Sequence, residues 1–116
     1  MRGAHTRTVG GARHVWRVDD LVAAAAGLPV TNEDPRTLID LDRDGWFGAE
    51  APTARRVLEH MRRVLDADLA HPVLLDADGS LMDGAHRVCK AILLGLPTLP
   101  AVRFPATPPP SSIEPL

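Results

Sequence analysis

The residues whose types and spacing best suit chemistry stand together in one segment, Asp83-Gly84-Ala85-His86-Arg87. An apolar run ending in an Asp-rich turn precedes it at 72–79, and a predicted helix continues from it to residue 94. A strand, a turn, a short strand, a glycine and a His-Arg pair at a helix start are well suited to holding a phosphate. Glycine lets the backbone approach closely, the N–H groups of the first helical turn point outward, and an arginine adds a planar fork of donors. The segment therefore predicts an anion site, without specifying a single reaction.

Two cations belong to this predicted site. Arg87 is either a phosphate ligand or a helix residue that pairs with Asp83. Lys90 lies about one turn later on the same helical face, so it either addresses the same anion or is an ordinary surface lysine. We predict Gly84, His86, Arg87 and Lys90 as the phosphate-binding residues, and we expect Arg87 to be exposed and to contribute little to stability.

The imidazole and the carboxylate of the segment are open to several roles. His86 is able to bind a metal, transfer protons, donate to phosphate or cap the helix. A metal site needs further ligands, and His60 and His71 are not spaced as a metal-binding pair with His86. Asp83 is able to hold Mg²⁺, act as a base or cap the helix N-terminus. Asp83 and His86 are therefore the candidate catalytic residues, and Asp83 is also the candidate metal ligand.

Other reactive or aromatic residues favour structural interpretations. Cys89 falls on the inward stripe of the predicted helix, where a thiol has neither the exposure nor the lowered pKa of a nucleophile. Trp46 and Phe47 either stack on a base or fill a corner of the core. The arginine pairs at 55–56 and 62–63 are most simply a solvated helix face.

Length and composition limit the class of protein. The chain has 116 residues, enough for one domain, and a net charge of −2 with a calculated pI near 6.2. A protein that grips duplex nucleic acid by its backbone usually carries a basic face or a high pI. The single cysteine fits a reducing compartment, no apolar run is long enough to span a bilayer, and the first residues lack the apolar stretch of a secretory signal. We therefore expect a cytoplasmic protein that does not enter a membrane.

Periodicity and turn signals predict the elements that must position the site. Residues 1–13 are interpreted as a flexible arm, 14–104 as the domain, and 105–116 as an extended or disordered Pro-rich tail. Strands are predicted at 14–18, 73–75, 81–82 and 99–104, a strand or a single turn at 38–41, and a loop at 30–35. Helices are predicted at 20–26 with Asp19 as N-cap, at 54–67 with Thr53 as N-cap, and at 85–94 ending at Gly95. In the 54–67 helix, one buried stripe is predicted: Val57, Leu58, Met61, Val64 and Leu65.

From about residue 54 to 104 the order of these features resembles the ParB/sulfiredoxin-like superfamily. The resemblance rests on a helix, then Pro72-Val73-Leu74-Leu75, the Asp83-Gly84-Ala85-His86-Arg87 box, and Leu94-Gly95-Leu96-Pro97 before a last β-run. It extends to stand-alone ParB-like small proteins that carry an Asp-Gly-x-His-Arg box. The resemblance implies an α+β fold, with a small mixed β-sheet flanked by helices.

The same resemblance implies nucleotide binding in a pocket at the box. Members of the superfamily bind and hydrolyse CTP, use ATP, or transfer a phosphoryl group, so ATP or CTP with Mg²⁺ are the implied cofactors. Gly84 and Arg87 match the glycine and the last arginine of the family box, and His86-Arg87 matches the sulfiredoxin His-Arg pair. Ala85 departs from the pattern, because it stands where sulfiredoxin has its catalytic cysteine and where ParB has a glutamate implicated in CTP turnover. Sulfinic-acid reduction is therefore not expected, and hydrolysis by the ParB route is in doubt.

Two functions remain open at this point. The first is a ParB-like nucleotide-binding protein, with Mg²⁺-dependent hydrolysis or phosphoryl transfer to a small acceptor. The second is a non-enzymatic interaction or partition-accessory module that retains the fold and acts with a protein partner. DNA binding by this chain alone is not expected, because the helix-turn-helix and dimerisation regions that follow this domain in partition proteins are missing from it.

Overall fold

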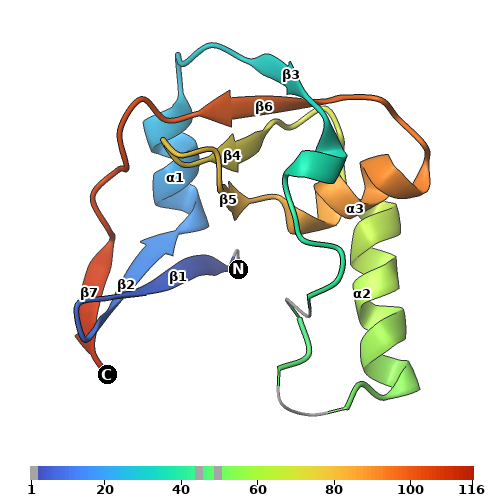
Figure 1. Ribbon diagram of the computed structural model, residues 1–116, viewed down its shortest axis with the longest axis horizontal. Helices are drawn as coiled ribbons and strands as arrows, with labels where there is room; N and C mark the ends of the chain where they lie inside the picture. Colours follow the sequence, from blue (N-terminus) through green and yellow to red (C-terminus); the bar gives the residue numbers. More distant parts are fainter. Residues whose placement is uncertain (1–2, 44–45, 49–50) are drawn as a thin grey trace.

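The computed structural model describes residues 3–43, 46–48 and 51–116, and shows an α+β fold. Its described parts contain two small sheets, three α-helices and one 3₁₀ turn (Figure 1). The strands are β1 (Ala4–Val9), β2 (Ala12–Arg17), β3 (Thr31–Glu33), β4 (Val73–Leu75), β5 (Leu81–Asp83), β6 (Leu99–Arg103) and β7 (Ser112–Pro115). The helices are α1 (Val18–Ala25), α2 (Ala54–Asp66) and α3 (Ala85–Leu93), with the 3₁₀ turn at Pro35–Thr37.

A four-stranded mixed sheet, in the order β3-β6-β4-β5, forms the centre of the fold. Strand β4 runs parallel to β6 and antiparallel to β5. Because side chains alternate along a strand, Leu74 and Val102 pack in a cluster with Leu21 of α1, whereas Val73 and Ala101 pack with Val88 of α3. The sheet is therefore covered on one face by α1 and on the other by α3. The predicted strands at 73–75, 81–82 and 99–104 are confirmed.

The segments predicted as a flexible arm and as an extended or disordered tail supply β1 and β7, which join β2 in a second sheet of the order β1-β2-β7. Strands β1 and β2 are an antiparallel hairpin, and β7 pairs antiparallel with the other edge of β2. Figure 1 shows this sheet beside α1 and away from α2. The prediction of a flexible arm was wrong at 4–9, whereas β7 is extended, as the tail prediction allowed, and is ordered by pairing with β2 far away in the sequence.

Two further predicted elements differ from the structure, and a third prediction, which allowed two alternatives, is decided by it. Helix α1 begins directly after β2 with Arg17 as its N-cap, so Asp19 lies inside the first turn instead of capping it. The predicted loop at 30–35 contains strand β3, which pairs with β6. Residues 38–41, predicted as a strand or a single turn, form no strand: two bends lead into a turn closed by the hydrogen bond from the Arg43 amide to the Asp40 carbonyl.

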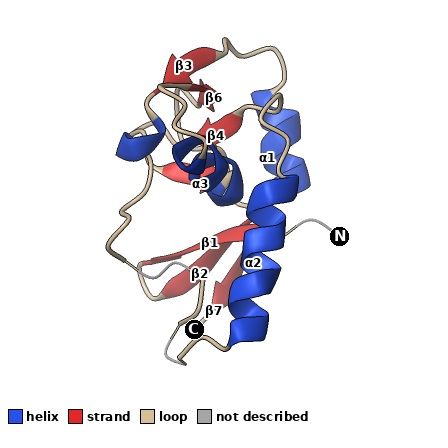
Figure 2. Ribbon diagram, turned by 90° about the vertical axis from the view of Figure 1, so that its right-hand side faces the viewer, coloured by secondary structure: helices blue, strands red, loops and turns tan. Residues whose placement is uncertain are grey.

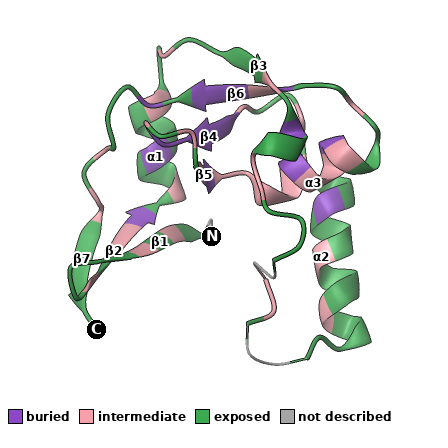
Figure 3. Ribbon diagram, viewed as in Figure 1, coloured by how far each residue is buried: buried purple, intermediate pink, exposed green. Residues whose placement is uncertain are grey.

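Helix α2 has the predicted N-cap but not the predicted burial. The Thr53 hydroxyl accepts a hydrogen bond from the Arg56 amide at 3.3 Å. Of the predicted buried stripe, only Val64 is buried, and Figure 3 shows most of the helix exposed. Figure 1 shows α3 between α2 and the central sheet, and Figure 2 shows α2 beside α3. The stripe therefore has one residue against α3 and the others toward solvent.

Candidate functional site

The conformation of the box depends on Gly84. This glycine has φ +111°, a region that residues with a side chain rarely adopt. A Cβ at this position would lie 2.6 Å from Cγ1 of Val73 in β4. Glycine is thus required for β5 to pass into α3 at close contact with the central strand, whatever the site binds.

Arg87 holds the box to the segment that enters β4. Its Nη2 donates to Oδ2 of Asp83 at 2.6 Å, and its Nη1 donates to the carbonyls of His71 and Pro72 at 3.0 and 2.8 Å. The side chains of Arg87 and Asp83 are only 16% and 19% exposed. The expectation of an exposed arginine with little structural role is therefore wrong, and pairing with Asp83 is the arrangement observed. Asp83 faces Arg87, and no side chain caps the N-terminus of α3.

Lys90 holds a different segment. Its Nζ donates to the carbonyls of Leu65 and Ala67 at 2.8 and 2.7 Å, at the C-terminal end of α2. A cation there satisfies carbonyls that lack helical partners and complements the negative end of the helix dipole. Lys90 and Arg87 thus fix two neighbouring segments in this structure, and a phosphate-binding role for Lys90 remains a prediction.

His86 belongs to an aromatic cluster that the sequence did not reveal. Its Nε2 lies 3.2 Å from Nδ1 of His60 on α2, a hydrogen-bond distance. The Trp46 ring stacks on both imidazoles, with centroid distances of 4.8 Å to His60 and 5.1 Å to His86. Burial lowers the pKa of His86, and the nearby His60 and Arg63 lower it further. The one available signal was that His60 lies four residues before the buried Val64 and so shares its helix face.

An open cleft of about 1210 Å³ lies along the box. The whole segment from Asp83 to Arg87 lines it, opposite apolar residues of α1 such as Val22. Arg63 and His71 add further basic groups to the lining, and His5 does so from β1. The structure therefore brings all the predicted site residues except Lys90 to one cleft, together with three basic residues that were not predicted.

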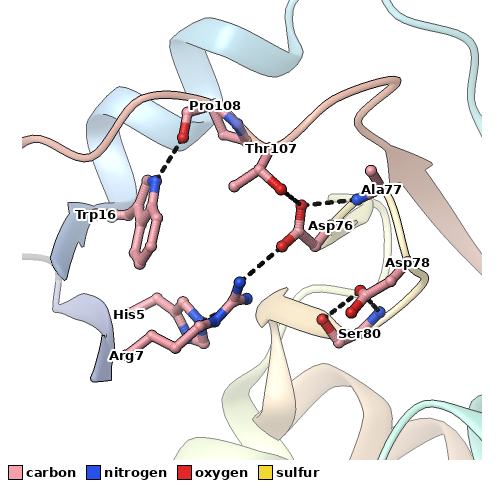
Figure 4. Close-up of polar contacts among 9 residues, drawn as sticks. All are labelled: His5, Arg7, Trp16, Asp76, Ala77, Asp78, Ser80, Thr107 and Pro108. Atoms are coloured by element: carbon pink, nitrogen blue, oxygen red, sulfur yellow. Dashed lines mark hydrogen bonds and ion pairs between the residues drawn. The ribbon is translucent and has the colours of Figure 1, made fainter. Parts of the chain in front are cut away.

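Next to the cleft, the buried carboxylate of Asp76 links β1 to the segment before β7. Figure 4 shows Asp76 bound by Arg7 from β1 at 2.9 Å and by Thr107 from the segment before β7 at 2.7 Å. Burial on its own would raise the pKa of Asp76, but the hydrogen bonds from Thr107, Arg7 and the Ala77 amide outweigh it and hold the pKa below its usual value. In the same region, the Trp16 indole donates to the Pro108 carbonyl at 2.8 Å. These contacts fix the strand that places His5 at the cleft.

The side chains around the box do not fit a resident metal ion. In the described ranges, no three His, Cys, Asp or Glu residues come together in a way that would hold a metal. Asp83, the predicted Mg²⁺ ligand, already gives one oxygen to Arg87. The His60–His86 pair supplies two nitrogens and no third ligand. The described side chains therefore form no three-ligand site for a resident ion, and Mg²⁺ entering with a nucleotide, which needs only one or two carboxylates, stays a prediction.

Cys89 is partly buried on α3, and burial raises the pKa of its thiol. A raised pKa keeps the thiol protonated at neutral pH, so it lacks the thiolate character of a nucleophile. This supports its interpretation as a packing residue.

Comparison with known proteins identifies no relative: no protein-family model matches the chain, and no curated protein or solved structure matches it significantly. In the part of the chain that is described, no helix has the length and apolar character needed to cross a bilayer. The site is therefore interpreted from its own geometry.

Proposed function

We propose that the cleft along the box binds the phosphate groups of a nucleotide. The observation that carries the proposal is the N-terminus of α3, which no side chain caps and whose first residues line the cleft. The first N–H groups of a helix lack intrahelical acceptors, and the helix dipole places partial positive charge there. An anion accepts hydrogen bonds from these N–H groups and is attracted by the partial positive charge.

Basic side chains in the cleft support the same ligand. Within the described residues the Arg63 side chain takes part in no ion pair or hydrogen bond, so its guanidinium is available to a ligand. Arg87 has five N–H donors, of which three bind Asp83 and the two carbonyls. Its Nε–H and second Nη2–H remain for a phosphate oxygen. His86 adds a donor when its ring presents an N–H toward the cleft.

The uncapped helix N-terminus and the basic side chains of the cleft support binding and carry no argument about turnover. Hydrolysis or phosphoryl transfer relies mainly on positioning and on neutralising the charge of the phosphates. The described side chains at the box form no three-ligand metal site, and Ala85 has no group able to act as acid or base. We therefore propose binding, and the phosphotransferase or NTPase activity implied by the resemblance stays a prediction.

The test is calorimetric titration with ATP, CTP and GTP, with and without Mg²⁺, on the wild type and two matched variants. Arg63→Ala removes a cleft cation that has no structural partner, whereas Arg62→Ala removes its neighbour, which does not line the cleft. We expect Arg63→Ala to weaken binding about tenfold, the usual loss for a charge-assisted hydrogen bond, and Arg62→Ala to leave it unchanged. Absence of heat with every nucleotide, or equal losses in both variants, would contradict the proposal.

A further inference from the structure

The exposed part of the α2 stripe forms an apolar surface together with the end of α3. Val57, Leu58, Met61 and Leu65 of α2 are 36%, 63%, 51% and 55% exposed, and Leu93 of α3 is 65% exposed. Between them lies a groove of about 280 Å³, which Trp46 and Phe47 help to line. Such a patch on a small chain is a common mark of an interaction site.

The charged residues nearest to the edges of this surface are basic. At about 100° per residue, the four exposed apolar residues of α2 cover about 100° of the helix, and Arg62 and Arg55 follow within about the next 60°. Arg56 and Arg63 lie on the other flank, beyond His60 and Val64. The two acidic residues of the helix, Asp66 and Glu59, follow Arg62 and Arg55 on the same side, about 80° and 100° from the nearer edge of the stripe. The charged residue nearest to each edge of the surface is therefore an arginine.

This arrangement argues against a second copy of the chain as the occupant. Two α2 helices packed antiparallel would place Arg55 and Arg62 against their own copies, because equivalent flanks face each other in that arrangement. Packed parallel, they would place the same arginines toward the flank that carries Arg56 and Arg63. Like charges oppose each other in both cases, which is unfavourable.

A membrane surface also fits less well than a protein. Attraction to anionic lipid scales with basic charge, and the chain as a whole has a net charge of −2. The apolar surface is also hollowed by the groove beside Trp46, which suits the insertion of a side chain.

We propose that this surface docks an amphipathic helix of a partner protein whose apolar stripe is flanked by carboxylates. An apolar side chain of the partner enters the groove between α2 and Leu93, and its acidic residues pair with Arg55 and Arg62. In the described residues neither of these two arginines takes part in an ion pair, so they are free to do so. Helix-in-groove recognition of this kind reads apolar anchors at helical spacing.

The test uses two synthetic helical peptides of roughly 18 residues with the same leucine stripe, one flanked by Glu and the other by Lys, titrated by fluorescence anisotropy. We expect the Glu peptide to bind at least about tenfold more tightly than the Lys peptide. Met61→Glu should lower that affinity by about tenfold or more by placing a charge in the apolar contact. Arg62→Glu should shift the preference toward the Lys peptide. The control is Ile113→Glu, an equally exposed apolar residue on β7, which should change neither affinity.

Four outcomes would overturn the proposal. These are no binding of either peptide, equal affinity for the two, a wild-type dimer by light scattering that Met61→Glu abolishes, and binding to phosphatidylserine vesicles that Met61→Glu abolishes. Circular dichroism melts of each variant separate a lost surface from a lost fold. Nucleotide titration of Met61→Glu, whose side chain does not line the cleft, should match the wild type, so failure here is distinguishable from failure of nucleotide binding.

Discussion

Helices α2 and α3 lie against each other and carry apolar residues at similar helical spacing, but their surroundings differ. Helix α3 buries Val88 and Ala91 against the central sheet, whereas α2 buries Val64 alone. The basic residues differ in the same way, because Arg87 and Lys90 of α3 bind backbone carbonyls and Arg55 and Arg62 of α2 project into solvent. Amphipathic spacing thus identifies a face, and the neighbouring elements decide whether that face stabilises the fold or is available to a partner.

The largest expected difference comes from placing a carboxylate on the apolar face of each helix. Val88→Asp should unfold the protein, with a loss of about 4 kcal/mol or more, because an unpaired carboxylate replaces a fully buried side chain. Leu58→Asp makes the same kind of change on α2 and should alter the free energy of unfolding by no more than about 0.5 kcal/mol. Urea denaturation of both variants measures the difference. Comparable losses in the two would show that the α2 stripe is covered.

The arginines offer a second, smaller contrast. Arg87→Ala should cost about 2–3 kcal/mol, because it removes three hydrogen bonds of a charged group and leaves Asp83 without its partner. Arg62→Ala should cost less than about 0.5 kcal/mol. Thermal melts in parallel provide the measurement. An unchanged melting temperature for Arg87→Ala would place this arginine in binding instead of structure.

The contact between the two helices should also depend on pH. The pKa of His86 is held below the usual histidine value of 6.5, so the unfolded chain takes up this proton at a higher pH than the folded one. Stability should therefore be complete above pH 6.5 and decline as the pH falls from there toward the lowered pKa. We expect His86→Gln to flatten this part of the stability-versus-pH curve, measured by urea denaturation between pH 7.5 and pH 5 at steps of about 0.5. A curve that keeps its slope in the variant would assign the dependence to other groups.

The smallest expected effect concerns Cys89. Because burial raises its pKa, the thiol should react slowly with a thiol reagent in the native protein and quickly after denaturation. Cys89→Ala should cost about 1 kcal/mol through a small cavity and leave nucleotide binding unchanged. Rapid labelling of the folded protein, slowed by bound nucleotide, would instead indicate a reactive site residue.

Sequence patterns predicted the elements with strong local signals. The Thr53 cap, the apolar run at Val73–Leu75 and the glycine after α3 each act over a few residues, so α2, β4 and the end of α3 were predictable. Strand β7 was not, because it is ordered by β2 across most of the chain. Strand β1 was missed although its pairing with β2 is local, through a hairpin turn at Gly10-Gly11. In the candidate site, too, only what depends on neighbouring residues was predictable. Clustering of the box residues followed from their adjacency, whereas the contact of His60 with His86, 26 residues away, depends on how two helices pack.

The links made by Asp76 bear on the order in which the chain folds. This one carboxylate joins Arg7, 69 positions away in sequence, to Thr107, 31 positions away. The stretch from β4 to β6 is made of near neighbours and can form early, since short loops close at low entropic cost. The pairing of β2 with β7 has to await the return of a segment from far along the chain. Assembly should thus proceed from the central sheet outward, and the three-stranded sheet should set the rate of the last step.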